Sequence, residues 1–96
     1  MFVITVRFEI ESEHLDEFKT LMMQQAANSL EKEAGCHQFD VCYSPDQTNV
    51  CFLYEKYTDL AAFDEHLASE HFVTFDKAVA AWVIDKQVGT WLEQTT

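Results

Sequence analysis

The chain has 96 residues, a length that fits one domain spanning residues 1–96. Its composition is 48% hydrophobic and 14% aromatic, with two glycines and one proline, which excludes a disordered or collagen-like protein. Seventeen acidic residues against six basic ones give a formal net charge of −11. This charge disfavours nucleic acid and anionic membrane surfaces as partners.

The cysteines and the N-terminal segment predict the cellular location. Cys36, Cys42 and Cys51 form no paired motif, and their odd number is not typical of a disulfide-stapled secreted domain. The first residues lack a basic segment followed by a long apolar stretch, and no run of about 18 apolar residues occurs that would span a membrane. We therefore expect reduced thiols, a cytoplasmic location and no membrane association.

The N-terminal third reads as a strand followed by a helix. Apolar and polar residues alternate over residues 2–10, which predicts a strand with one buried face. After it, apolar side chains recur at helical spacing, which predicts a long amphipathic helix that begins with Ser12 as its N-cap and ends at Gly35.

A hairpin is predicted next, from the alternation over residues 38–43 and 50–55 and the turn residues between them. If residues 45–48 form the loop, Val41 faces Phe52, Phe39 faces Tyr54, and Cys42 faces Cys51. The first two pairs then lie on an apolar face under the helices. The opposite face is mixed in polarity and is typical of an assembly interface or of a solvated surface.

The last third predicts two short helices and a strand. Thr58 or Asp59 caps the first helix, and Ser69 marks a break before the second. Alternation over residues 84–93 predicts a final strand. The order strand–helix–strand–strand–helix–strand is that of an α+β protein with a ferredoxin-like βαββαβ fold.

His66 is the first candidate for chemistry. No glycine-rich phosphate loop or nucleophile elbow is present, so nucleotide-dependent and serine-hydrolase chemistry are excluded. His66 follows the apolar stripe of its helix by one turn, where an imidazole can reach a cavity and transfer protons near neutral pH. The alternative is a half-buried histidine that hydrogen-bonds a backbone carbonyl.

A metal site is not expected from the two nearby histidines. On a continuous helix His66 and His71 lie about 140° apart and cannot face one ion, unless the break at Ser69 turns His71. Glu55, at the end of a strand, is a candidate base if it is partly desolvated, or else an exposed or ion-paired carboxylate. In a strand Tyr54 and Glu55 point to opposite faces, so they do not share a pocket.

Three segments resemble the antibiotic biosynthesis monooxygenase superfamily, and together the similarity covers nearly the whole chain. They are the stretches at residues 33–41, 52–57 and 59–72. The histidine-containing motif at residues 62–72 resembles the quinol-monooxygenase and autoinducer-processing branch. The resemblance implies a dimeric α/β barrel, in which two sheets pack face to face and each subunit holds one small-molecule pocket between sheet and helices.

The resemblance implies a cofactor-independent monooxygenase that oxidises a small aromatic or quinol-type substrate with O₂, without metal. His66 is then the proton-transfer residue, Tyr54 its orienting hydroxyl and Glu55 a second catalytic candidate. The expected substrate-binding residues are His71 and Phe72 at the pocket entrance, with Phe39 and Phe52 at its floor.

Two other functions remain open from the sequence. The same acid–base groups serve an isomerase or degrading enzyme that acts on a small autoinducer-like carbonyl sugar derivative. A non-catalytic dimer that binds a small molecule is the other alternative. The few basic residues form no cluster for phosphate, which favours a neutral aromatic substrate over a phosphorylated one.

Overall fold

The computed structural model describes residues 1–95 as one α+β unit with a four-stranded sheet. Short 3₁₀ turns precede α1 and follow α3, and the main elements come in the expected order. The elements are β1 (Phe2–Ile10), α1 (Leu15–Lys32), β2 (Cys36–Tyr43), β3 (Val50–Tyr57), α2 (Leu60–Ala68), α3 (Glu70–Val79) and β4 (Val83–Leu92).

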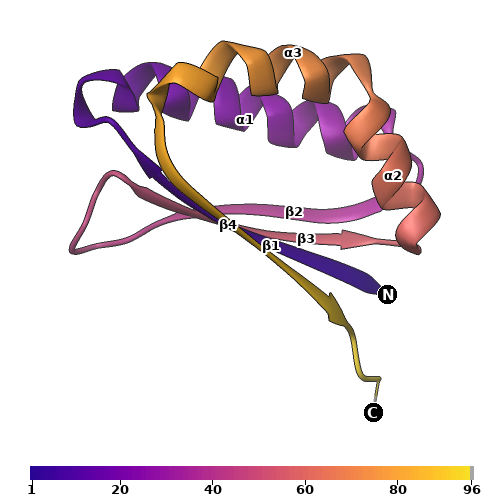
Figure 1. The fold of residues 1–96 in the computed structure, drawn as a ribbon. Coiled ribbons are helices and arrows are strands. Elements are labelled where there is room, and N and C mark those ends of the chain that lie inside the picture. The colour runs from indigo at the N-terminus through magenta and orange to yellow at the C-terminus, as the bar shows by residue number, and fades with distance from the viewer. Residues whose placement is uncertain (96) are drawn as a thin grey trace.

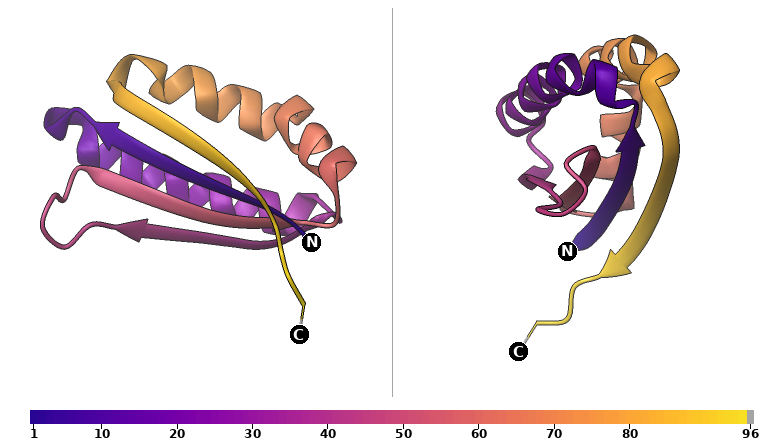
Figure 2. Two further views of the ribbon diagram at one scale, coloured as in Figure 1. Left: turned by 60° about the horizontal axis from the view of Figure 1, so that its bottom comes forward. Right: turned by 90° about the vertical axis from the view of Figure 1, so that its left-hand side faces the viewer.

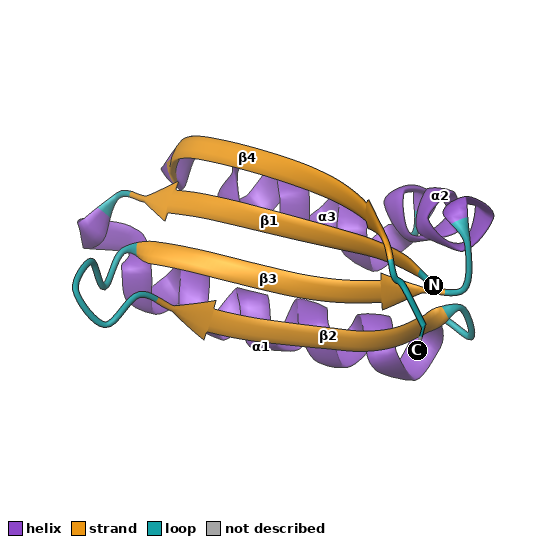
Figure 3. Cartoon of the chain, turned by 90° about the horizontal axis from the view of Figure 1, so that it is seen from below, coloured by secondary structure: helices purple, strands orange, loops and turns teal. Residues whose placement is uncertain are grey.

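The sheet lies below the helices in Figure 1 and is antiparallel throughout, with the strand order β2-β3-β1-β4. All the helices cover one face of it, and α1 and α3 run side by side over that face (Figure 2). The other face carries no helix (Figure 3). The predicted ferredoxin-like βαββαβ fold is thus confirmed, with a candidate cavity between sheet and helices.

The core lies between the sheet and α1. Alternate residues of β1, among them Ile4, Val6 and Phe8, are buried toward the helices, as the period of two predicts. From α1, Phe18 and Met22 are fully buried against them. The same stripe of α1 also buries two polar residues, Gln25 and Ser29, where the helical pattern places apolar side chains.

The helix starts agree only partly with the sequence prediction. Ser12 does not cap α1: it begins a 3₁₀ turn, α1 starts at Leu15, and no side chain caps it. Asp59 caps α2, because its carboxylate accepts a hydrogen bond from the Ala62 amide at 2.9 Å. Ser69 separates α2 from α3 as expected.

The predicted hairpin register is wrong by one residue. In the structure Val41 pairs with Leu53, Phe39 with Glu55, and Cys42 with Phe52. The β2–β3 loop is longer than expected because Asn49 belongs to it, held by a 2.9 Å hydrogen bond from its Nδ2 to the Ile10 carbonyl. A shift of one residue moves every side chain of one strand to the other face.

The register shift changes the sheet's outer face, defined here as the face without helices. Phe52 and Tyr54 lie on this face, and Phe52 is 42% exposed. Trp91 of β4 also lies there and donates from its indole Nε1 to the Thr5 hydroxyl at 2.9 Å. Cys42 is exposed on this face, whereas Cys51 is buried on the other, so the predicted Cys42–Cys51 juxtaposition is also wrong.

Over residues 1–95, none of the helices combines the length and the apolar character that crossing a bilayer requires.

Candidate functional site

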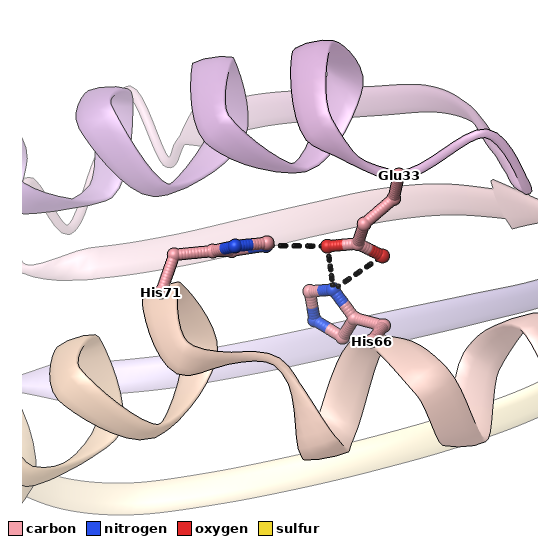
Figure 4. Close-up of side chains that lie close together, drawn as sticks. All are labelled: Glu33, His66 and His71. Atoms are coloured by element: carbon pink, nitrogen blue, oxygen red, sulfur yellow. Dashed lines mark hydrogen bonds and ion pairs between the residues drawn. The ribbon is translucent and has the colours of Figure 1, made fainter.

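A buried carboxylate lies between two histidines at the point where α1, α2 and α3 meet (Figure 4). Glu33 Oε2 is 2.8 Å from His66 Nδ1 and 2.5 Å from His71 Nε2. The side chains of Glu33, His66 and His71 are 11%, 4% and 9% exposed, respectively. An ionised carboxylate only accepts hydrogen bonds, so both imidazoles donate to Glu33.

Ser69 is the residue that brings the two histidines together. Its backbone is extended, with φ −67° and ψ 147°, so that α2 ends and α3 starts in a new direction. Its hydroxyl donates to the His66 carbonyl at 2.6 Å and accepts from the Phe72 amide at 3.3 Å. The break therefore turns His71 toward Glu33, which a continuous helix does not allow.

The environment of His66 favours its neutral form. Burial lowers the pKa of His66 below its ordinary value of 6.5, against the opposing effect of the Glu33 hydrogen bond and charge. Aromatic rings surround it, with the Phe72 ring centroid at 5.0 Å and that of Phe63 at 6.0 Å. With Nδ1 donating to Glu33, the neutral ring keeps the lone pair of Nε2 available as a base.

The His66 ring forms part of the wall of a largely apolar cavity between the sheet and the helices. About 510 Å³ of space between its walls is not filled by atoms, and part of this space is open to solvent. Exposed side chains from α3 and β4, including Asp76 and Lys86, lie at its open side. The other lining residues are Ile4, Val6, Phe8, Met22, Gln25, Phe39, Leu53, Glu55, Phe63, Leu67, Phe72, Phe75 and Val88.

Glu55 provides a second titratable group in this cavity, on the sheet side. It is 2% exposed, and burial raises its pKa from 4.5 to about 7, despite the hydrogen bond that the Tyr57 hydroxyl donates to Oε1 at 2.5 Å. The structure thus places Glu55 on the cavity side of β3, where the predicted register had placed its neighbours.

The predicted site residues divide into two groups. His66, Glu55, Phe39 and Phe72 line the same cavity. Tyr54 and Phe52 do not: both lie on the outer face of the sheet, so their expected positions beside His66 and at the cavity floor are wrong.

The predicted entrance residue His71 does not line this cavity. It lines a second hollow between α1 and α3, which shares the lining residues Gln25 and Phe75 with the cavity. The Glu33 carboxylate thus links a histidine of the cavity to a histidine of the outer hollow.

The sequence interpretation assigned no role to Glu33 or Gln25. Glu33 lies just beyond the end of α1, and the only sequence signal for it is its place at the start of the stretch that resembles the family. Gln25 is visible as a polar residue within an apolar helical stripe. Neither signal by itself predicts which side chains meet in space.

The two buried cysteines, Cys36 and Cys51, are poor nucleophiles in this environment. Burial raises the pKa of Cys36 to about 12 and that of Cys51 to about 11. Thiolate chemistry near neutral pH is therefore disfavoured at both positions.

Glu33, His66 and His71 also form a donor set that could hold a transition metal ion. One oxygen and two imidazole nitrogens lie within 4.8 Å of one another. Two histidines and one carboxylate suit Zn²⁺ or Fe²⁺. The same atoms are equally satisfied by the hydrogen bonds already described, so the geometry fits either state.

Comparison with known proteins agrees with this architecture. Solved structures with nearly complete mutual coverage share the fold, although their sequence identity to this chain is low. A structure named antibiotic biosynthesis monooxygenase superposes with a TM-score of 0.92 at 22% identity, covering 99% of this chain and 100% of the other. Rv0793 from Mycobacterium tuberculosis gives a TM-score of 0.90 at 21% identity, with 99% and 96% covered.

PA3566 from Pseudomonas aeruginosa gives a TM-score of 0.90 at 20% identity, with 98% of this chain and 94% of the other covered. No curated protein matches the sequence. The family model described as "Antibiotic biosynthesis monooxygenase" matches residues 1–78, which include the whole Glu33–His66–His71 cluster. The chain therefore belongs to the antibiotic biosynthesis monooxygenase family.

Proposed function

We propose that the protein is a cofactor-independent monooxygenase that oxidises a small, neutral aromatic substrate of the quinol type with O₂. The observation that carries the proposal is the His66 imidazole, oriented by Glu33 and lining an apolar cavity rich in aromatic side chains. Membership of a family named for monooxygenases supports the reaction class.

In this mechanism His66 acts as the general base. Its Nε2 takes the proton of a substrate hydroxyl, and Glu33 stabilises the imidazolium that results. The substrate anion is electron-rich and reduces O₂ directly. A hydroquinone and O₂ then give a hydroxyquinone and water: a new carbon–oxygen bond forms, the O–O bond breaks, and the substrate supplies all the electrons.

The outer face supports a homodimer formed through the sheets. It carries exposed Phe52 and Trp91 among polar side chains, and helices cover only the opposite face of the sheet within residues 1–95. A sheet face of this mixed character is typical of an interface between subunits. We include this assembly in the proposal, with the small-molecule cavity on the helix side of each subunit.

The test is O₂ uptake by metal-stripped protein with a panel of hydroquinones and polycyclic phenols. The His66→Ala variant is expected to lose at least about 100-fold in kcat, because general-base catalysis contributes that much or more. His37→Ala is the matched control, since His37 is exposed and bonds the Thr58 hydroxyl away from the cavity. Uptake that is equal in wild type and His66→Ala would contradict the proposal.

An isomerase is a second candidate, and the position of Glu55 favours it. Glu55 on the sheet and His66 on α2 are two proton-transfer groups in one cavity, and the pKa of Glu55, about 7, suits proton transfer at neutral pH. An isomerase that works through an enediol needs such a pair and no O₂. Exchange of a carbon-bound substrate proton with solvent deuterium under anaerobic conditions would assign the protein to this class instead.

A further inference from the structure

Glu55 holds its carboxyl group at the sheet side of the cavity, in surroundings that favour the protonated form. It is 2% exposed, and its partners on the two neighbouring strands, Ile4 and Phe39, are apolar and line the same cavity. Burial raises its pKa from 4.5 to about 7, so protonated Glu55 is populated at neutral pH. Among residues 1–95, the other carboxyl group at this cavity belongs to Asp76, which is exposed.

The Tyr57 hydroxyl determines which oxygen of Glu55 carries this proton. Tyr57 is fully buried, and its hydroxyl donates to Glu55 Oε1 at 2.5 Å. Since Oε1 already accepts this bond, the proton of the neutral carboxyl group lies on Oε2. Within residues 1–95, Oε2 has no hydrogen-bond partner, but it is not sealed from solvent as the unpaired Ser29 hydroxyl is. Because Glu55 lines the cavity, this accessible oxygen faces the cavity.

Glu55 and His66 lie at the same end of the cavity, on different walls. Tyr57 contacts both, because its ring centroid is 5.4 Å from that of His66 and its hydroxyl bonds Glu55. Phe39, the partner of Glu55 on β2, has its ring centroid 6.2 Å from that of His66. A ligand in the cavity can therefore contact His66 from the α2 side and Glu55 from the β3 side.

The proposed oxygenation needs proton transfer at a second position. After O₂ adds to the substrate anion, the ring carbon next to the reacting oxygen carries both a hydrogen and a peroxide group. Formation of the new carbonyl requires a proton on the terminal peroxide oxygen and loss of the C–H proton. His66 is assigned to the substrate hydroxyl, so a second group in the cavity suits this carbon.

We propose that Glu55 is the catalytic acid and base of O–O cleavage: its Oε2–H group protonates the terminal peroxide oxygen, and the resulting carboxylate removes the C–H proton. The C–H electron pair forms the new C=O bond, and the O–O bond breaks. The departing hydroxide takes the proton held by His66 and becomes water, so both residues return to their starting states. The inference rests on the proposed function for its substrate and assigns the step after O₂ addition. Tyr57 is a positioning residue, because it acts only through Glu55.

The test is the fate of the oxygen that the enzyme consumes. Metal-stripped protein is given 1,4-naphthohydroquinone, and hydroxynaphthoquinone and H₂O₂ are measured against O₂ uptake, with the rate without enzyme subtracted. Wild type should form hydroxynaphthoquinone without H₂O₂. In Glu55→Gln the uncleaved peroxide should leave the ring as H₂O₂, together with naphthoquinone. Formation of hydroxynaphthoquinone should fall at least about 100-fold, while O₂ uptake that depends on His66 persists.

Two further variants separate a chemical role from a structural one. Glu65→Gln is the matched control, because Glu65 is exposed on α2 and does not line the cavity, and it should keep the wild-type product. Tyr57→Phe keeps the Glu55 carboxyl group but removes the bond that orients it, so it should release H₂O₂ for part of the O₂ consumed. Loss of folded protein would instead lower O₂ uptake and all products in proportion.

Three results would overturn the inference. If Glu55→Gln forms hydroxynaphthoquinone at the wild-type rate without H₂O₂, Glu55 does not act on the peroxide, although the oxygenase proposal stands. If Glu55→Gln consumes no O₂ but still shows a cooperative thermal unfolding transition, Glu55 acts before O₂ addition. If wild type shows no enzymatic O₂ uptake with this or any other hydroquinone, the role of Glu55 falls with the proposed function itself.

Discussion

At the scale of single residues, Glu33 is the group on which both histidines depend. We expect Glu33→Gln to lower kcat about 10- to 100-fold, as loss of an orienting partner of a functional histidine typically does. The pH profile should also change. The Glu33 hydrogen bond and charge raise the pKa of His66, so their loss should move the acidic limb of kcat to lower pH.

A pH profile measured from about pH 4.5 to 8 on wild type and Glu33→Gln checks this prediction. A uniform loss of rate with an unmoved acidic limb would show that Glu33 does not act through His66.

Glu55 makes a prediction about stability. Its pKa is raised from 4.5 to about 7 in the folded protein, so the folded state binds the proton more tightly than the unfolded state does. The associated stability is complete below pH 4.5 and is lost as pH rises through about 7, a difference of about 3 kcal/mol. Glu55→Gln should remove this dependence.

Urea unfolding at several pH values between about 4 and 8 measures it. The difference in free energy of unfolding between Glu55→Gln and wild type should grow with pH across this window. The lowered pKa of His66 has the opposite effect, since it makes stability rise with pH. This contribution is common to wild type and Glu55→Gln, so it cancels in the difference between them. A constant difference would show that the Glu55 carboxyl keeps an ordinary pKa.

The Glu33–His66–His71 donor set predicts how metal ions act on the protein. If His66 acts as a base with no metal bound to it, the enzyme keeps its activity after treatment with a chelator. Added Zn²⁺ should then inhibit the enzyme, because the ion binds His66 Nδ1, the nitrogen that contacts Glu33. His71→Ala should weaken this inhibition. Activity that disappears on chelation and returns with Fe²⁺ or another ion would contradict cofactor-independent chemistry.

At the scale of elements, the two serines near helix starts are a matched pair. Ser69→Ala removes the hydroxyl that accepts from the Phe72 amide and should cost about 1 kcal/mol in free energy of unfolding. Ser12→Ala should cost little, because Ser12 makes no capping bond to α1. Chemical denaturation of both variants measures the difference, and equal losses would contradict the assigned caps.

Features that depend on neighbouring residues could be predicted from the sequence better than those that depend on long-range contacts. Local patterns located the strands, the Ser69 break and a cap of α2 at Thr58 or Asp59, because each depends on neighbours within one turn. The Ser12 cap is an equally local prediction and was wrong, because a 3₁₀ turn precedes α1. The β2–β3 register failed because it depends on a long-range contact: Asn49 bonds the Ile10 carbonyl of β1 and lengthens the loop. Because of this error, the prediction placed Tyr54 on the cavity side of β3, where the structure places Glu55.

The contact between Glu33 and the two histidines also could not be predicted from local sequence patterns. Glu33 lies more than thirty positions before either histidine, and the contact depends on how α1 packs against α2 and α3. The spacing of the two histidines predicted only that both could face one group if the helix breaks at Ser69. Nothing in the helical pattern indicates which carboxylate lies opposite.

At the scale of the whole molecule, the proposed dimer predicts the effect of a charge on the outer face. Phe52→Lys should convert the dimer to a monomer, because a buried lysine at the centre of an interface leaves its charge unpaired. Met23→Lys is the control, since Met23 is similarly exposed, at 58%, but lies on α1. Light scattering at micromolar concentration should give twice the mass of one chain for wild type and for the control. A wild-type monomer would contradict the assembly.

The short segment between His66 and His71 cannot gain or lose residues without separating His71 from Glu33. Each residue added to a helix rotates all later residues of that helix by about 100°, so one insertion among residues 67–70 would carry His71 away from Glu33. The loop at residues 44–49 contributes no residue to the cavity wall, and Asn49 ties it to β1. Related chains that keep this chemistry should therefore vary in length at the hairpin and preserve the five-residue step from His66 to His71.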